Sequence, residues 1–256
     1  MNSNSGAFSV PSGYQLAHFT EIGSTNDEAK RAAETGEPGN LWVVADRQTA
    51  GRGRRGRGWV SGLGNLFASV MIRPAAAPEA SGLLSLAASL AVHDALASLT
   101  GSGDALTCKW PNDVLLNGAK VAGILLESAS SGGRIDWAVI GIGINVAYAP
   151  SGLPYPAASL RDAGFAGLSA ADVFAALAQS VAVRIGDWEA GSGEGLRDAW
   201  LARAHGLGGK ITAHVGTATV AGTFEGLDSD GTLIVREAAG GVRRIRSADV
   251  FPQSGS

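Results

Sequence analysis

The chain has 256 residues, a formal net charge of −3 at pH 7 and a single cysteine, Cys108. One cysteine excludes an internal disulfide and is typical of a reducing compartment, so we expect a cytoplasmic protein. The slightly negative charge argues against general coating of nucleic acid, and the sequence contains neither a long apolar run nor a signal-peptide pattern that would point to a membrane. The histidines show no spacing typical of zinc ligands.

The first half of the chain alternates predicted strands and helices. An apolar strand at 14–22 precedes an alanine-rich helix at 24–34, in which Thr25 and Glu28 match a capping box and Ser24 is the other candidate cap. Hydrophobic periodicity then predicts strands at 41–45 and 65–74 and a core helix at 83–99.

The second half continues the sheet and then changes character. A strand at 105–110 precedes a hairpin over 114–127, because Asn117-Gly118 between two apolar runs is typical of a tight β-turn. Further elements are a strand at 135–146 and helices at 169–188, capped by Ser169, and at 196–204. From Gly206 onward, short β-rich segments alternate with turns, which predicts a small barrel-like domain. We therefore expect a flexible tail at 1–13, a main domain at 14–205 and a β domain at 206–252.

Between two predicted strands lies GRGRRGRG (51–58), followed by Trp59; we call residues 51–58 the arginine loop. Such a segment can be solvated surface or can bind RNA, but this one is single, short and placed inside the fold. Ordering its backbone costs about 1–2 kcal/mol per residue, and one charge-assisted hydrogen bond returns about 1.5–3 kcal/mol. Several bonds to one dense anion, such as a phosphate, are needed. We predict that the loop is mobile when empty, because its guanidinium groups repel one another, and that it closes over a phosphate.

Other glycine motifs are less informative. The arginine loop is not a P-loop, since no Gly-Lys-Ser/Thr ends it. The fragment GIGIN (141–145) lacks the third glycine of a dinucleotide fingerprint and lies within a predicted strand, so we reject a Rossmann site. Its glycines indicate either close packing of another group against the strand or a tight crossing of the sheet.

Lysine is rare in this chain, and Lys109 and Lys120 lie close together in the segment CKWPNDVLLNGAKVAGILLE. Lys109 ends a predicted apolar strand, where a buried cation is costly without an anion partner. Read alone, the following WPND (110–113) is a turn before a hairpin. Together with the arginine loop, it favours a fixed cation over which that loop closes.

The motifs GRGRRGRGW, KWPND, KVAGILLE and GIGINV, in this order and at these spacings, resemble those of the biotin protein ligase family. The resemblance runs from about Tyr14 to the C-terminus. It implies an α+β fold: a class II synthetase-like mixed sheet with helices, as in biotin and lipoate ligases, plus a small C-terminal SH3-like β-barrel. It also implies the short form of the family, because the residues before the first predicted strand are too few for the N-terminal DNA-binding domain of larger members.

The resemblance carries site roles onto matching residues. Lys109, Arg54 and Arg57 match catalytic positions. Biotin-binding positions are matched by Ser24, Thr25, Asn26, Gln48, Gly51, Arg52, Gly53, Arg54, Lys109, Gly123, Ile124 and Leu125. Nucleotide-binding positions are matched by Arg52, Arg54, Arg55, Arg57, Trp59, Asn112 and Asn145. The metal ligands are left unassigned, with Asp113 as the candidate neighbour of a magnesium ion.

The activity that the resemblance implies has two steps. Biotin, ATP and Mg²⁺ give biotinyl-5′-AMP, and the biotin is then transferred to a lysine of a biotin carboxyl carrier protein. No DNA or membrane partner is expected, and a homodimer is left open. Two alternatives remain: a lipoate ligase or octanoyl transferase on the same fold, and an RNA-binding module that uses the arginine loop. The negative net charge and the lack of aromatic residues within the loop count against the RNA-binding module.

Overall fold

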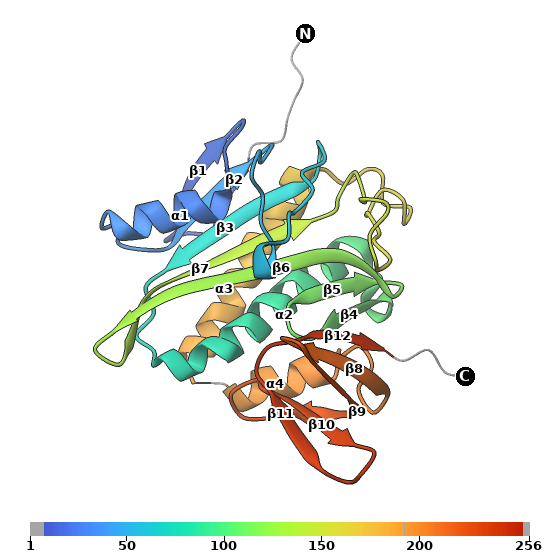
Figure 1. The fold of residues 1–256 in the computed structure, drawn as a ribbon. Coiled ribbons are helices and arrows are strands. Elements are labelled where there is room, and N and C mark those ends of the chain that lie inside the picture. The colour runs from blue at the N-terminus through green and yellow to red at the C-terminus, as the bar shows by residue number, and fades with distance from the viewer. Residues whose placement is uncertain (1–7, 192, 253–256) are drawn as a thin grey trace.

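Two β-sheets organise the chain in the computed structural model, which describes residues 8–191 and 193–252 (Figure 1). The larger sheet has the strand order β1-β2-β3-β7-β6-β5-β4. β1 pairs with β2 in parallel and the other neighbours pair antiparallel, so this sheet is mixed. Its strands are β1 (Gln15–Phe19), β2 (Leu41–Ala45), β3 (Leu66–Ile72), β4 (Leu106–Lys109), β5 (Asp113–Leu116), β6 (Ala119–Ser131) and β7 (Arg134–Ile144).

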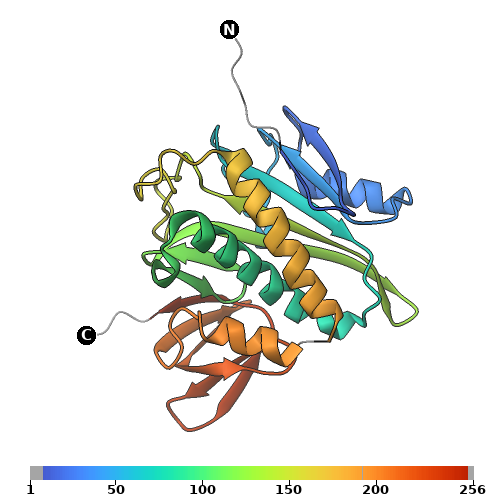
Figure 2. The same ribbon diagram turned by 180° about the vertical axis from the view of Figure 1, so that it is seen from behind.

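Helices cover both faces of the larger sheet. α1 (Thr25–Glu34) packs against β2, β3 and β7 on one face. α2 (Ser81–Thr100) and α3 (Ala170–Glu189) pack against each other on the opposite face (Figure 2). α4 (Gly193–Leu201) contacts α2 and α3 and reaches β9 of the smaller sheet. Single turns of 3₁₀ helix lie at Arg54–Gly56, Pro78–Ala80 and Gly103–Ala105.

Strand β3 shows how the sequence separates the two faces of the sheet. All seven of its residues, LFASVMI, are buried. Val70 and its alternate neighbours join the core that contains α2 and α3, whereas Met71 joins a smaller core with residues of α1. This is the two-residue period of a β-strand. Ser69 is the polar exception on the α1 face, and its hydroxyl hydrogen-bonds to Thr25 Oγ1 at 2.8 Å.

The helix predicted at 83–99 is confirmed as a core helix. With its preceding turn, Pro78–Thr100 is the one helix among the described residues that is long and apolar enough to cross a membrane, and 61 % of its most apolar window is buried inside the fold. A helix that packs against other elements all around its circumference is apolar on every side for that reason.

The two predicted helix caps have different outcomes. At α3, Ser169 Oγ accepts a hydrogen bond from Asp172 N at 3.2 Å and Asp172 Oδ2 accepts one from Ser169 N at 2.9 Å, so this cap is confirmed. The capping box of Thr25 and Glu28 is wrong, because Thr25 is already helical and its backbone N–H donates to Gln48 Oε1 at 2.8 Å. The acceptor for the N–H at the start of α1 is therefore the side chain of Gln48, which is distant in sequence, and not a residue of the predicted capping box.

The small domain is a five-stranded antiparallel sheet with the order β11-β10-β9-β8-β12. The fold class expected from the resemblance is confirmed: a mixed sheet with helices and a C-terminal antiparallel sheet of SH3-like type. Trp110 joins the two parts, because its Nε1 donates to Gly231 O at 3.1 Å. The strands are β8 (Lys210–Val215), β9 (Ala218–Leu227), β10 (Leu233–Glu237), β11 (Val242–Ile245) and β12 (Asp249–Pro252).

Two local predictions concern turns and tails. The hairpin turn is confirmed, since Asn117 and Gly118 have φ of 50° and 79°, the positive values that a tight two-residue turn needs. Residues 1–7 of the expected N-terminal tail and residues 253–256 lie outside the described residues. Phe8, by contrast, packs with its ring centroid 5.4 Å from that of Phe174. This part of the expected tail therefore contributes to the main domain.

Candidate active site

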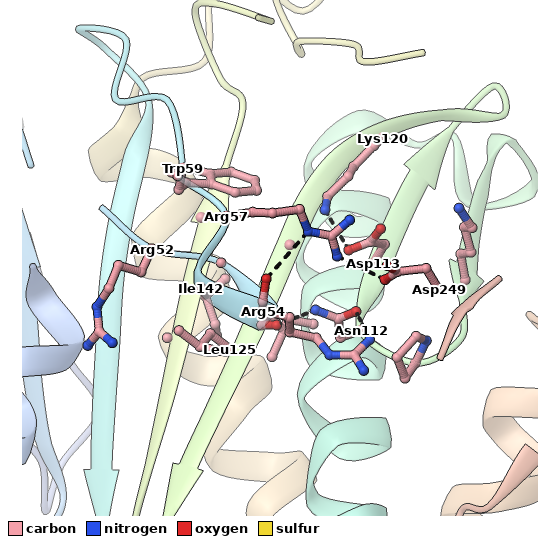
Figure 3. A pocket seen from close by; sticks show the side chains of 18 of the residues that line it. Arg52, Arg54, Arg57, Trp59, Asn112, Asp113, Lys120, Leu125, Ile142 and Asp249 are labelled. Carbon is pink, nitrogen blue, oxygen red and sulfur yellow. Dashed lines mark hydrogen bonds and ion pairs between the residues drawn. The ribbon is translucent and has the colours of Figure 1, made fainter. Parts of the chain in front are cut away.

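One pocket gathers most of the predicted site residues (Figure 3). Its walls come from the start of α1, the arginine loop, the turn between β4 and β5, strands β6 and β7, and strand β12 of the small domain. Of the residues predicted from the sequence, Gly51, Arg55 and Asn145 do not line this pocket and all the others do. Segments more than 200 residues apart in the sequence therefore meet at one place.

Glycines of β6 and β7 form the floor of the pocket because side chains lie directly on them. A Cβ added at Gly141 would overlap the amide of Asn26. A Cβ at Gly143 would lie 2.5 Å from the Trp59 ring, and one at Gly123 would lie 2.7 Å from the same ring. The alternation of glycine and isoleucine in GIGIN thus reflects packing of Asn26 and Trp59 against the strand, rather than a tight crossing of the sheet.

One end of the pocket is lined by Thr25, Asn26 and Gln48, which together with Ser69 form a hydrogen-bond network of uncharged side chains. We call these four residues the amide end. Thr25 Oγ1 donates to Gln48 Oε1 at 3.1 Å, and Ser69 Oγ lies 2.6 Å from Asn26 Oδ1. Asn26 Nδ2 donates to Glu127 Oε2 at 2.9 Å. Thr25, Asn26 and Ser69 are buried, so their orientations are fixed before any ligand binds.

The arginine loop meets carboxylates of the protein itself. Arg57 and Arg55 pair with the two oxygens of Asp249, at 2.9 and 3.0 Å. Arg52 pairs with Asp27 and lies 3.7 Å from Glu127. The prediction that these guanidinium groups only repel one another in the empty protein is therefore wrong, because carboxylates distant in the sequence pair with three of the four loop arginines. Mobility of the empty loop stays a prediction.

Arg54 is the loop arginine that points into the pocket without a carboxylate within ion-pair distance among the described residues. Its guanidinium donates to Ser247 Oγ at 2.6 Å, to Asn112 Oδ1 at 3.2 Å and to Ala248 O at 3.3 Å. Burial, with repulsion from Arg55 and Arg57, lowers the pKa of Arg54 against the attraction of Asp249. The Arg54 guanidinium therefore hydrogen-bonds only to neutral groups, and its positive charge remains available to an anion.

Lys109 and Lys120 differ sharply in their partners. Lys120 Nζ lies 2.7 Å from Asp113 Oδ1 and also faces the Trp59 and Tyr155 rings. Lys109 has no carboxylate within 4 Å among the described residues. Burial lowers the pKa of Lys109, and attraction by Asp113 only partly opposes this. We call Arg54, Arg57 and Lys109 the cationic end of the pocket.

Two predicted nucleotide contacts are engaged with the backbone. Asn112 Nδ2 donates to Ile124 O at 2.6 Å, which leaves Asn112 Oδ1 to orient Arg54. Asn145 is buried and donates to Ala158 O at 3.1 Å. It lines a neighbouring cavity that shares Trp59, Lys120 and Tyr155 with the main pocket. Gly51 is the first residue of the loop, and its carbonyl accepts a hydrogen bond from Trp59 N at 2.9 Å.

Several pocket residues had no role in the sequence analysis. Lys120 lines the pocket, and Glu127 lies behind it as the hydrogen-bond partner of Asn26. Both belong to the quoted motif KVAGILLE, where charges at the two ends of an apolar run were the available signal. Ser69 was a lone polar residue in a buried strand, which is a weaker signal of the same kind. Asp249 and Phe251 of β12 carry no local signal, since only the packing of the small domain brings them to the pocket.

Metal ligands are sparse at the site. No group of three or more histidine, cysteine, aspartate or glutamate side chains that could hold a metal ion occurs within residues 8–191 and 193–252. Asp113, the candidate magnesium neighbour, is paired with Lys120.

Comparison with known sequences identifies both parts of the chain. Residues 18–145 match the model of the biotin/lipoate A/B protein ligase family, and residues 206–251 match that of the biotin protein ligase C-terminal domain. The biotin–[acetyl-CoA-carboxylase] ligase of Paracoccus denitrificans is 43 % identical over 234 residues, which span 89 % of this chain and 96 % of that protein. The bifunctional ligase/repressor BirA of Bacillus subtilis is 33 % identical over 243 residues, or 93 % of this chain and 74 % of that protein.

Solved structures give the same relationship. A biotin protein ligase from Aquifex aeolicus in complex with biotin and ATP superposes with a TM-score of 0.79 at 26 % identity, covering 93 % of this chain and 99 % of that one. One from Leishmania major in complex with biotinyl-5-AMP has a TM-score of 0.61 at 27 % identity, covering 90 % and 98 %. With both sequence segments, the fold and the pocket in agreement, the chain belongs to the biotin protein ligase family.

Proposed function

We propose that this chain activates biotin with ATP and transfers it to a lysine of a biotin carboxyl carrier protein. In the first step the biotin carboxylate attacks the α-phosphorus of ATP, giving biotinyl-5′-AMP and pyrophosphate. In the second, the acceptor amine attacks the carbonyl carbon and AMP leaves. The observation that carries the proposal is one pocket with a prebuilt amide end and a cationic end, in a chain of this family.

The amide end suits the polar ring of biotin. Thr25, Asn26 and Gln48 present hydroxyl and amide groups to the pocket at the start of a helix. Ser24 lines the same end, and the backbone of 123–125 lines the adjoining wall. Ser69 and Glu127 hold Asn26 in one orientation, so we assign them positioning roles for biotin.

The cationic end addresses the difficulty of the first step. A carboxylate anion must approach a polyphosphate anion, and fixed cations aimed at the developing charge reduce that repulsion. Lys109, Arg54 and Arg57 line the pocket and are the groups we assign to this task. Arg52 lies nearer α1, on the biotin side, through its contact with Asp27. The adenine would occupy the neighbouring cavity between Trp59, Tyr155 and Asn145.

Magnesium would supply further neutralisation of phosphate charge. Mg²⁺ commonly binds one or two carboxylates together with substrate phosphates and waters. Asp113 and Asp249 are the carboxylates that line the pocket, and both are paired with cations in the described structure. We therefore assign no dedicated protein site to the ion and derive no step from it.

The second step requires a neutral amine and a protected adenylate. Nearby cations lower the pKa of an approaching lysine amine, which favours its neutral form. The arginine loop covers the pocket and would keep water from the reactive anhydride. Burial raises the pKa of the Cys108 thiol to about 12, so we assign it packing rather than chemistry. A lone buried thiol suits a cytoplasmic enzyme.

Mass spectrometry tests the proposal directly. The protein incubated with biotin, ATP and Mg²⁺ should retain biotinyl-5′-AMP and release pyrophosphate, and addition of a biotin carboxyl carrier domain should yield a single biotinylated lysine. Parallel reactions with lipoate or octanoate separate the alternative on the same fold. Activation of lipoate and not of biotin would reverse the assignment. RNA binding with a steep salt dependence, and no ATP turnover, would favour the RNA-binding module instead.

A further inference from the structure

The last strand of the small domain reaches into the pocket of the main domain. Asp249 and Phe251 are two residues apart on β12, so their side chains lie on the same face of the strand. Both line the pocket. Asp249 contacts the arginine loop, and the Phe251 ring centroid lies 5.2 Å from Lys109 Nζ. One strand therefore touches both kinds of cation at the reacting centre.

The Phe251 ring is the direct partner of the Lys109 ammonium. Among the described residues, Lys109 Nζ makes no ion pair with a carboxylate, whereas Lys120 Nζ has Asp113 at 2.7 Å. The negative face of an aromatic ring attracts an ammonium within about 6 Å of its centroid. The Phe251 ring also packs against His214 of the neighbouring strand β8, with 5.5 Å between the two ring centroids. The small domain thus supplies an aromatic ring that is fixed by packing, and the main domain supplies the Lys109 ammonium.

We propose that Phe251 is a positioning residue for Lys109, which keeps the ammonium in the pocket without occupying its hydrogen-bond donors. A carboxylate at this place would compete with the carboxylate and phosphate of the substrates. An aromatic ring attracts the same cation but accepts no strong N–H bond, so the three donors stay available. The inference rests on the proposed function, because it concerns the lysine assigned to adenylate formation.

The Phe251 ring opposes the effect of burial on the charge of Lys109. Burial acts first to lower its pKa, and the ring favours the charged ammonium form. Removing the ring should therefore lower the pKa of Lys109 further, and the alkaline limb of activity should move to lower pH. The charged and titratable groups that face Lys109 from the surrounding elements are Asp113, Asp249, Lys120, Arg57 and His205.

The primary test compares Phe251→Leu with Phe251→Tyr. Biotin-dependent pyrophosphate release is measured from pH 6 to pH 10. We expect Phe251→Leu to lose about threefold to thirtyfold in kcat, the range that one cation–π contact corresponds to, with a smaller change in KM for biotin. Its alkaline limb should shift to lower pH. Phe251→Tyr, which keeps the ring, should restore both the rate and the limb.

A matched control separates positioning from stability. Phe224 is a buried phenylalanine of the same small domain, and it does not line the pocket. Phe224→Leu should lower the melting temperature without shifting the alkaline limb. If Phe251→Leu lowers only the melting temperature, or if Phe251→Leu and Phe251→Tyr give the same pH profile, the positioning role is wrong.

A second readout does not depend on turnover. The chain has only Lys30, Lys109, Lys120 and Lys210, so ¹³C reductive methylation gives few lysine signals, and Lys109→Ala identifies the one of interest. That signal should show a ring-current shift that disappears in Phe251→Leu and persists in Phe251→Tyr. No shift in the parent protein would overturn the inference. An inactive parent protein with the shift present would instead count against the proposed function.

Discussion

The two ends of the pocket are built on different principles. At the amide end, Thr25, Asn26 and Ser69 are buried and their polar atoms bond to one another or to neighbouring side chains. At the cationic end, Arg57 is paired with a carboxylate from another domain, and its side chain remains 54 % exposed. Buried networks of satisfied groups are rigid, whereas exposed ion pairs contribute little and exchange readily.

This difference suits the two kinds of substrate. A neutral polar ring binds best to donors and acceptors that are already oriented, because no ordering cost remains. A polyanion can replace the carboxylate partners of the arginines, so the protein holds those cations near their working positions until the anion arrives. We therefore propose that the amide end selects the substrate ring and that the cationic end rearranges when the anion binds.

The largest effect is expected from Lys109→Ala at the cationic end. Loss of one fixed donor to developing charge commonly costs 10²–10³-fold in rate, so adenylate formation should fall by about that factor. Biotin affinity, which depends on the amide end, should change by less than about tenfold. Pyrophosphate release and calorimetric biotin binding measure the two quantities, with exposed Lys210→Ala as the control. Unchanged pyrophosphate release would remove Lys109 from the mechanism.

Arg54→Gly should uncouple activation from retention of the adenylate. Arg54 joins the arginine loop to Asn112 and to the small domain, so its loss should open the cover over the pocket. Losing one charge-assisted bond corresponds to about tenfold to hundredfold faster escape of biotinyl-5′-AMP. Biotinylation of bystander lysines on an added albumin reports the escape. Arg47→Gly, which removes an exposed arginine paired with Glu21, is the control. Labelling confined to the carrier would contradict the sealing role.

Gly141→Ala tests the amide end. The added methyl group overlaps the Asn26 amide, which cannot move without losing its bonds to Ser69 and Glu127. We expect the free energy of unfolding to fall by about 1–3 kcal/mol and biotin affinity to fall by about tenfold. Gly186→Ala on the exposed side of α3, where the added Cβ would meet no other part of the structure within 4 Å beyond its own helix backbone, should be neutral or stabilising. Unaltered biotin affinity in Gly141→Ala would show that the amide end adapts after all.

Local patterns predicted the elements and motifs of the main domain well. The turn at Asn117-Gly118 and the cap at Ser169 depend on residues within a few positions of each other, and both are confirmed. The motifs around Lys109 and the arginine loop identified the family, because their order and spacing are more specific than any of them alone.

What the sequence could not predict depends on long-range packing. Gln48 accepts the hydrogen bond from the first N–H of α1 in place of the expected local cap. Local sequence preferences carry no information about an acceptor so far along the chain. Asp249 and Phe251 lie in a separate domain, whose docking alone gives them neighbours in the pocket. The charges within the arginine loop predict mutual repulsion, but the small domain brings Asp249 into contact with Arg55 and Arg57.

The smallest effect is expected from Asp249→Asn, which removes the carboxylate that Arg55 and Arg57 share. Partly exposed pairs of this kind contribute a few tenths of a kcal/mol each, so the empty loop should be cut by trypsin about two to five times faster. Saturation with biotin and ATP should remove most of this difference, because the ligand then replaces the carboxylate. A Glu21→Gln control alters an exposed pair elsewhere. Equal cleavage rates in the empty proteins would mean that Asp249 does not hold the loop.

The same pairs should make the docking of the loop sensitive to acid. Burial alone would raise the pKa of Asp249, but the hydrogen bond and charge of Arg57, with the charges of Arg55 and Arg54, outweigh it and lower the pKa. A lowered pKa means that the pairs contribute fully above the ordinary aspartate value of about 3.9 and are lost as the pH falls through the lower folded value. Hydrogen exchange of the arginine loop, corrected for intrinsic rates, should therefore lose protection between pH 5 and pH 2.5 in the parent protein and stay flat in Asp249→Asn. An identical loss in both proteins would assign the acid response to other groups, and the cationic end would then be as rigidly prebuilt as the amide end.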